Sequence, residues 1–250
     1  MADLLDEAPA RALAVYAHPD DPEISCGGTL ARWAASGAEV HLLLLTTGDK
    51  GSSDTTADPA ALAARRAVEV GEAAGVLGLA GWDQFGAADG ELDNTADVRA
   101  RIVAALRRIR PDVVVCPDPT AVFFGDTYFN HRDHRVTGWA TLDAVSPAAG
   151  SPRYFPEAGP AHAVSQVLLS GTLEPNVWVD VGTTIDAKVR ALLCHESQLA
   201  ATTFAPGGAA FGHEGGTADW LASLLRQRAE EGGRAAGVRY AEGFRRLALS

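Results

Sequence analysis

Apolar runs of strand length recur along the chain, and each of the first four is followed by a polar loop and a segment with helical periodicity. The predicted strands cover residues 13–17, 40–46, 81–85, 113–116, 163–170 and 177–181. The predicted helices cover residues 30–36, 57–79, 95–110, 133–145, 183–197 and 218–231. Largely apolar runs are typical of strands buried on both faces. The alternation predicts an α/β fold: a Rossmann-like open, mostly parallel β-sheet flanked by helices, with the active site at the carboxyl edge of the strands.

Three stretches lack this regularity, and we predict loops there. Residues 118–132 join a strand to a helix, and residues 147–160 are rich in proline and are expected to run over the surface. Residues 198–217 are rich in Gly and Ala and hold His213, a candidate lid residue. Prolines and glycines at this density end regular elements.

Composition limits the classes of function. The chain has 250 residues, of which 47% are hydrophobic, so we expect one domain, residues 1–250, with a sizeable core. A net charge of −11 argues against nucleic acid and anionic membranes as partners. The first residues lack the pattern of a signal peptide and no apolar run is long enough to span a bilayer, so we expect a soluble cytoplasmic protein. The three cysteines are too widely spaced for a disulfide framework and are expected to be buried free thiols.

The loop after the first strand, HPDDP at 18–22, concentrates one imidazole and two carboxylates between two prolines. The prolines are expected to exclude a helix interior here, so the following helix is predicted only from residue 30. His18 and Asp21 have a workable spacing for two ligands of one divalent metal, with Asp20 as a carboxylate beside it. A catalytic zinc site needs a third protein ligand. The alternative is that Asp20 and Asp21 merely cap the helix.

A second group with the same chemistry, HRDH at 131–134, follows the fourth strand and therefore opens at the same sheet edge. His131 and His134 are one helical turn apart and can face the same way. One of them can bind the metal while the other stands beside the metal-bound water. Asp133 can orient a neighbouring imidazole.

Together these pieces resemble the LmbE-like, or PIG-L, family of zinc-dependent N-acetylglucosaminyl deacetylases, and are nearest in pattern to the bacterial bacillithiol-biosynthesis type. The specific pieces are AHPDDPEISCGGTL from Ala17 and HRDHR from His131. The other matching pieces are weaker singly and occur in the family's order: TTGDKG from Thr46, R-x-x-E at Arg66 and Glu69, DGEL from Asp89, RPDVVV from Arg110, HESQ from His195 and YAEGF from Tyr240.

The resemblance implies a role for each matching residue. The implied zinc ligands are His18, Asp21 and His134. Asp20 is implied as the general base, and His131 as the histidine that stabilises or protonates. The family's substrate-site arginine falls on Arg66, and Asp133 matches the aspartate that supports a ligand. By periodicity alone, Arg65, Arg66 and Glu69 favour a solvated helix face instead.

One departure from the family concerns the tyrosine that some relatives place over the metal. The matching stretch ends in Trp220 and holds no tyrosine, and Phe129 stands where other members have one. Candidate replacements as the oxyanion donor are Trp220, His213 and Tyr128.

The resemblance implies hydrolysis of the N-acetyl group of a small-molecule N-acetylated amino sugar with Zn2+ as cofactor. Two histidines and one aspartate do not by themselves exclude Fe2+ or another divalent metal. By analogy with relatives, the chain is expected to form a homo-oligomer, a trimer or hexamer. Two alternatives stay open: an amidase acting on a thiol-sugar conjugate, and a non-catalytic Rossmann-like ligand-binding domain. Against the second, Gly27 and Gly28 form no phosphate-binding pattern.

Overall fold

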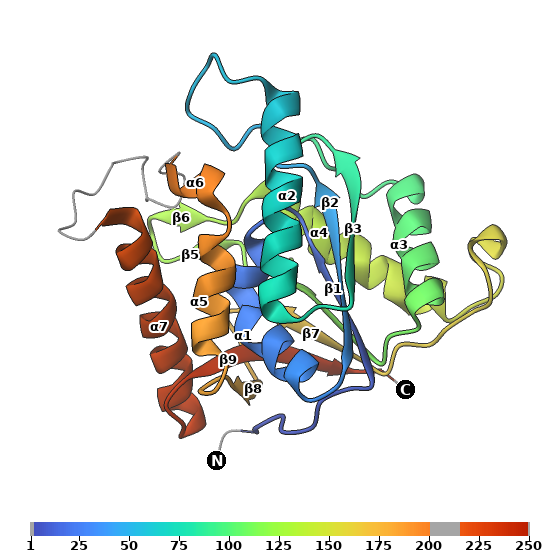
Figure 1. Cartoon of the computed structure of the whole chain (residues 1–250). Helices are drawn as coiled ribbons and strands as arrows, with labels where there is room; N and C mark the ends of the chain where they lie inside the picture. The colour runs from blue at the N-terminus through green and yellow to red at the C-terminus, as the bar shows by residue number, and fades with distance from the viewer. Residues whose placement is uncertain (1–2, 201–215, 250) are drawn as a thin grey trace.

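A seven-stranded sheet in the order β3-β2-β1-β4-β7-β9-β8 forms the centre of the molecule (Figure 1). The computed structural model describes residues 3–200 and 216–249. The strands are β1 (Arg11–Tyr16), β2 (Glu39–Thr46), β3 (Gly81–Ala87), β4 (Val113–Pro117), β7 (Gln166–Ser170), β8 (Val177–Asp180) and β9 (Ala241–Ala248). The first five strands in this order, β3, β2, β1, β4 and β7, are parallel to one another. Strand β9 runs antiparallel to both β7 and β8. The predicted open, mostly parallel sheet is confirmed.

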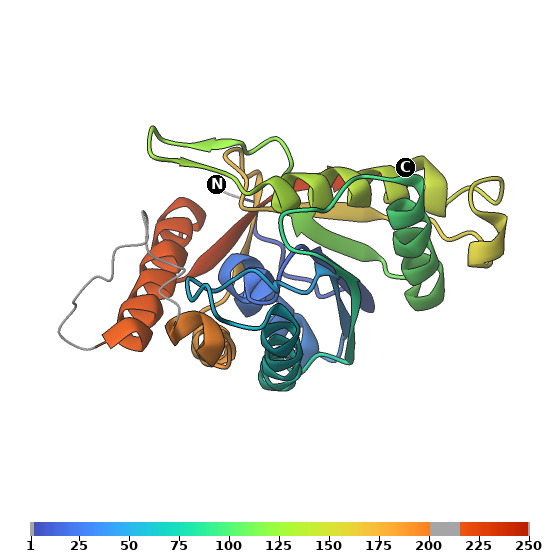
Figure 2. The same cartoon turned by 90° about the horizontal axis from the view of Figure 1, so that it is seen from above.

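Helices cover both faces of the sheet, as the view from above shows (Figure 2). They are α1 (Asp21–Ala35), α2 (Pro59–Leu77), α3 (Ala96–Ile109), α4 (Arg132–Asp143), α5 (Ile185–Leu193), α6 (Glu196–Ala200) and α7 (Gly216–Ala236). Side chains of β1 alternate between two apolar cores: Ala14 and Tyr16 pack with α1, whereas Leu13 and Val15 pack with α3 and α4. This alternation explains why β1 is apolar at every position after Arg11.

Helix α1 begins much earlier than the predicted residue 30. Its first residue is Asp21, and Pro22 lies in the first turn, where a missing N–H costs no hydrogen bond. The prolines therefore mark the start of the helix, and the prediction that they exclude it was wrong. The backbone departs from helical geometry at Cys26 (φ −145°, ψ 17°), and the helix continues through Gly28.

The loop and tail predictions missed several elements. The segment 118–132 contains a small hairpin of β5 (Phe123–Phe124) and β6 (Tyr128–Phe129). The tail forms β9, whose inward-facing Glu242 carboxylate lies 2.5 Å from the Lys188 ammonium and accepts the Thr29 N–H at 2.7 Å. Because a charged residue occupies an inward-facing position, β9 lacks the apolar alternation by which strands are predicted from sequence. The ion pair with the distant lysine offsets the energetic cost of burying the carboxylate.

The proline-rich segment 147–160 is only partly on the surface. Ala148 and Ala149 are buried. The buried guanidinium of Arg107 donates hydrogen bonds to six backbone carbonyls of this segment, those of Ala148, Ala149, Ser151, Tyr154, Phe155 and Gly159. An irregular backbone is stable here because one cation satisfies its carbonyl groups.

Two further expectations concern cysteines and membranes. All three cysteines are free; Cys26 and Cys116 are buried as predicted, whereas Cys194 is only half-buried. In the described ranges, no helix combines the length and the apolar character that crossing a bilayer requires.

Gly28 tests how closely α1 packs on the end of β8. A Cβ at this position would lie 2.8 Å from Val181 Cβ, so Gly28→Ala is expected to lower the free energy of unfolding by about 1–3 kcal/mol. Gly75 in α2 is the control, because a Cβ there meets nothing within 4 Å. Gly75→Ala is expected to raise the free energy of unfolding by about 0.4–1 kcal/mol. Urea unfolding of both variants checks this, and equal effects would contradict the packing argument.

Candidate metal centre

Three polar side chains from two separate loops converge at the carboxyl edge of the sheet. His18 follows β1, Asp21 begins α1, and His134 lies in the first turn of α4, after β4. The Asp21 carboxylate approaches both rings, with Oδ1 3.0 Å from His134 Nε2 and Oδ2 3.3 Å from His18 Nδ1. His18 Nδ1 and His134 Nε2 are 3.2 Å apart. Two ring nitrogens and the two oxygens of one carboxylate therefore lie close together, each ring nitrogen within 3.3 Å of the carboxylate.

Contacts on the outer side of each imidazole determine which nitrogen carries its proton. His18 Nε2 lies 3.0 Å from Asp89 Oδ1 and 3.4 Å from Asp133 Oδ2. His134 Nδ1 lies 2.9 Å from the side-chain oxygen of Asn130. Because these carboxylate and amide oxygens are acceptors, the hydrogen-bond network assigns protons to those nitrogens and leaves lone pairs on His18 Nδ1 and His134 Nε2.

This donor set fits a divalent metal. Two imidazole lone pairs facing each other at 3.2 Å repel unless a cation lies between them. Two nitrogens and one carboxylate match the ligand types of catalytic zinc, and acceptors behind metal-binding histidines are the usual arrangement. The ring nitrogens of His18, His131 and His134 also lie within 4.8 Å of one another.

The pKa values of the cluster point to the same conclusion. Burial lowers the pKa of His18, but the carboxylates of Asp21, Asp133 and Asp89 outweigh it and raise the pKa well above its usual value. Burial raises the pKa of Asp21, but His134 and His18 outweigh it and hold the pKa well below its usual value. The cluster thus favours positive charge at its centre, where a metal ion would supply it.

Asp20 adjoins the cluster in a strained conformation. Its φ of 94° lies in the left-handed region, which is uncommon for residues other than glycine and is often found at functional sites. Burial raises the pKa of the Asp20 carboxyl to about 6, with Arg66 opposing the rise and Asp21 adding to it. The Asp20 side chain makes no capping hydrogen bond to α1, and Asp21 Oδ2 accepts the N–H of His18 at 2.8 Å. The alternative that these aspartates merely cap the helix was wrong.

The guanidinium of Arg66 holds Asp20 in place. It donates to the Pro19 carbonyl at 2.5 Å, to Asp20 Oδ2 at 3.0 Å and to the Gly48 carbonyl at 2.9 Å. Glycines at positions 48 and 51 leave room for it, because a Cβ at either would collide with the guanidinium. Only 3% of Arg66 is exposed. The backbone before α1 is therefore tied to α2 through one side chain.

The prediction of a solvated face on α2 was wrong for Arg66 and Glu69, although Arg65 stays largely exposed. The Glu69 carboxylate accepts the N–H and the hydroxyl of Ser197 at 2.8 and 2.6 Å. The segment after α5 therefore covers this face, which no local pattern in α2 indicates. His195 on the same segment is fully buried, with Nε2 3.4 Å from Glu23 Oε2.

His131 stands at the open side of the cluster. Its ring centroid is 4.8 Å from that of His18, and its Nδ1 accepts the N–H of Asp133 at 3.2 Å. This bond leaves the Nε2 proton available as a donor. Burial and the neighbouring His18 and His134 lower the pKa of His131, which favours the neutral ring.

The structure thus brings together all seven residues expected at the site: His18, Asp20, Asp21, Arg66, His131, Asp133 and His134. Sequence reasoning assigned no role to Asp89, Asn130, Glu23 or His195. The DGEL and HESQ pieces held the signal for Asp89 and His195, but neither spacing indicates which side chain each would contact. His213 lies outside the described residues.

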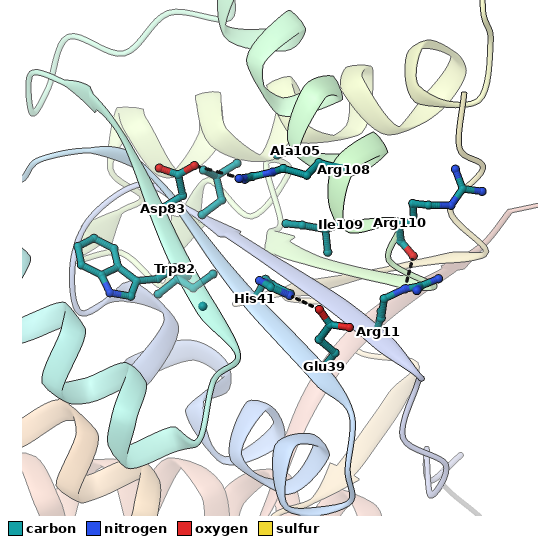
Figure 3. A pocket seen from close by; sticks show the side chains of 12 residues that line it. Arg11, Glu39, His41, Trp82, Asp83, Ala105, Arg108, Ile109 and Arg110 are labelled. Carbon is teal, nitrogen blue, oxygen red and sulfur yellow. Dashed lines mark hydrogen bonds and ion pairs between the residues drawn. The ribbon is translucent and has the colours of Figure 1, made fainter. Parts of the chain in front are cut away.

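A separate hollow lies at the opposite ends of the strands (Figure 3). Its volume is ≈610 Å³, and it lies between α3 and the first residues of β1, β2 and β3. Two polar pairs line it: His41 with Glu39 at 3.0 Å and Arg108 with Asp83 at 3.3 Å. None of the residues expected at the active site lines this hollow. It therefore has no part in the metal centre.

Comparison with known proteins finds relatives over most of the chain. The PIG-L family pattern, described as GlcNAc-PI de-N-acetylase, matches residues 13–145. Diacetylchitobiose deacetylase of Thermococcus kodakarensis is 34% identical over 94% of this chain and 82% of its own length. A 1D-myo-inositol 2-acetamido-2-deoxy-alpha-D-glucopyranoside deacetylase of Rhodococcus jostii is 33% identical over 79% of this chain and 84% of its own length.

A solved structure agrees in fold as well. The N,N'-diacetylchitobiose deacetylase of Pyrococcus horikoshii superimposes with a TM-score of 0.81 at 29% identity, over 96% of this chain and 84% of its own. The matched family segment, residues 13–145, contains every residue of the metal cluster. The chain belongs to the PIG-L, or LmbE-like, family of deacetylases.

Proposed function

We propose that this protein is a zinc-dependent hydrolase that removes the N-acetyl group from an N-acetylated amino sugar or a related glycoside. The observation that carries the proposal is the convergence of His18, Asp21 and His134 on one point with the Asp20 carboxylate beside it. Two of its relatives are deacetylases of N-acetylated sugars, which supports the choice of substrate.

In this proposal, His18 Nδ1, His134 Nε2 and the Asp21 carboxylate hold the metal. A divalent metal bound there supplies Lewis acidity, polarising the acetamide carbonyl and making water a better nucleophile at neutral pH. Zinc is the proposed ion because three protein ligands with an open position are typical of catalytic zinc sites. The same donor types also suit Fe2+, so metal analysis decides between them.

Asp20 acts as the general base. Its carboxylate takes the proton of the attacking water and later returns it to the amine that leaves. The raised pKa makes this carboxylate a better proton acceptor than an exposed aspartate. Arg66 acts through Asp20: it is buried against that carboxylate, which supports a positioning role and disfavours direct contact with substrate.

His131 donates a hydrogen bond to the oxygen that gains negative charge as water attacks the carbonyl carbon. The argument is that its Nδ1 accepts the Asp133 N–H, so the proton lies on Nε2. Tyr128 is a candidate for a further donor, because burial and the charge of Asp21 raise the pKa of its hydroxyl and so favour the protonated form. Asp133 orients His18 from behind.

Removing the base should stop turnover without removing the metal. For Asp20→Asn we expect kcat to fall by about 10²–10⁴-fold with unchanged metal content, because the amide cannot accept the proton. Acetate release from N-acetylglucosamine and plasma mass spectrometry provide the two readouts. Asp83→Asn, at an exposed ion pair far from the cluster, is the control. A variant that keeps most of its activity would show that Asp20 is not the base.

Removing one metal ligand should empty the centre. The purified protein is expected to hold about one metal ion per chain and His134→Gln to lose most of it, since the remaining two ligands bind weakly. His41→Gln, at the opposite end of the sheet, is the matched control and should retain metal. Plasma mass spectrometry of the three proteins identifies the ion. Equal metal content in His134→Gln and the wild type would contradict the assignment.

Asn130 tests whether a hydrogen bond to the outer nitrogen of the proposed ligand His134 strengthens metal binding. Asn130→Ala removes the acceptor for His134 Nδ1, so we expect the metal dissociation constant to rise about 10–100-fold. Competition with a chelator measures this constant. Asn94→Ala is the control, because Asn94 pairs with Asp143 away from the cluster. An unchanged dissociation constant would show that the Asn130 contact does not support the ligand.

A further inference from the structure

The HESQ segment, residues 195–198, has no part in the proposed mechanism, yet three of its four side chains are buried polar groups. His195 is fully buried, Gln198 is 2% exposed and Ser197 is 8% exposed. The segment follows α5, which packs against both α1 and α2 (Figures 1 and 2). Because buried polar groups need partners, their contacts show which parts of the structure this segment holds together.

His195 contacts the turn of α1 that begins at Asp20. Its Nε2 lies 3.4 Å from Oε2 of Glu23, a buried residue in the first turn of the helix. The Asp20 carbonyl accepts the N–H of Ile24 at 3.1 Å, so Asp20 and Glu23 belong to the same turn. The histidine therefore rests on the helical turn that starts at the proposed base.

Ser197 and Gln198 contact the part of α2 that carries Arg66. Ser197 donates its N–H and its hydroxyl to the carboxylate of Glu69, which lies one turn after Arg66 on the same buried face. A Cβ at Gly51 would lie 2.5 Å from Arg66 Nη1 and 2.8 Å from Gln198 Oε1, so the guanidinium and the amide approach the same point. The HESQ segment thus joins the first turn of α1 to α2 beside the ion pair that holds the proposed base.

The conformation of Asp20 depends on restraints of this kind. Its φ of 94° is strained, and a strained residue persists only where the surrounding structure holds it. Arg66 restrains it from one side, through the Pro19 carbonyl and the Asp20 carboxylate. The contact of His195 with Glu23 restrains the turn on the other side. With both sides held, Asp20 cannot relax without breaking a buried contact.

The atoms of the His195 contact are not arranged for stability alone. Within the part of the chain that the structure describes, Glu23 Oε2 and both ring nitrogens of His195 are buried without a hydrogen-bond partner. Replacing a buried polar pair of this kind by apolar side chains of similar size is often neutral or stabilising. Stability therefore gives no reason for a polar pair here, whereas a role in positioning does.

We propose that His195 is a positioning residue for the reaction: the HESQ segment holds the first turn of α1 against α2 and thereby fixes the Asp20 carboxylate beside the metal centre. This inference rests on the proposed function. A displacement of about 1 Å in a catalytic group can lower turnover about 10²-fold. Loss of the contact is therefore expected to lower kcat without removing the metal or weakening substrate binding.

Two substitutions of similar size separate the polar contact from simple packing. His195→Gln keeps an N–H donor near the place of Nε2, whereas His195→Leu fills the same space without one. With N-acetylglucosamine as substrate, we expect His195→Leu to lower kcat about 10–100-fold with unchanged KM and metal content, and His195→Gln to keep most of kcat. His162→Leu is the control and should keep kcat, because His162 contacts the Pro111 carbonyl before β4 begins. Equal losses in the Leu and Gln variants would show that His195 only fills space.

A double-mutant cycle tests whether His195 acts through Asp20. In the Asp20→Asn protein, whose residual acetate release is followed at high enzyme concentration, we expect His195→Leu to cause no further loss. The same fractional loss in both backgrounds would contradict the positioning role and indicate a general weakening of the fold. Ser197→Ala is the milder variant, because it keeps the backbone N–H to Glu69 and loses only the hydroxyl. It decides the question if His195→Leu does not fold, with an expected loss of about 3–10-fold that is absent in the Asp20→Asn background.

Amide hydrogen exchange in the first turn of α1 provides a readout that needs no turnover. We expect His195→Leu to speed exchange of the peptide that contains Ile24 about 10-fold, and His162→Leu to leave it unchanged. If the wild type releases no acetate while exchange depends on His195, the proposed function fails and the restraint on this turn stands. Unchanged exchange together with unchanged kcat overturns the inference even if the wild type is an active deacetylase.

Discussion

The parallel pairing of β1 with β4 is the constraint on which the metal centre depends. Ala12, Leu13 and Ala14 pair in register with Val113, Val114 and Val115, so the two strands end side by side. The loops that follow carry His18 and His134, which are 116 positions apart in the chain. Because parallel strands have their carboxyl ends at the same edge of the sheet, the two polar loops lie next to each other. Their side chains therefore form one candidate set of metal ligands. A shift of register would separate the donors without changing either loop.

Around this edge, buried charges join elements that the sheet alone does not hold together. Arg66 ties α2 to the loop before α1, and Glu69 ties α2 to the segment after α5. On the other side of α1, the Lys188–Glu242 pair joins α5 to β9. A buried charge without a partner is strongly destabilising, so each pair penalises arrangements in which its elements separate. The predicted base therefore rests on a scaffold in which several segments have one compatible position.

The centre also combines rigid and open parts. His18 and Asp21 are buried and bonded on several sides, whereas His131 and the hairpin before it are exposed. The exposed side is open to solvent, and its aromatic residues lie on a hairpin and not on the sheet. This division agrees with the general tendency of α/β proteins to build specificity from loops on a fixed scaffold.

The sequence by itself determined the parallel sheet and the two polar loops, because apolar runs and helical periodicity are local properties of neighbouring residues. It also indicated the HPDD and HRDH pieces, since metal-binding side chains in short spacing need no distant information. Only the tertiary structure decided which imidazole nitrogens face the centre, because Asp89, Asp133 and Asn130 set them through contacts between separate segments. It likewise decided the burial of Arg66 and Glu69 and the existence of β9. Each depends on a partner far away in the chain, which is Asp20 for Arg66, Ser197 for Glu69 and Lys188 for Glu242. The energy of such a contact leaves no periodic trace in the sequence around either residue.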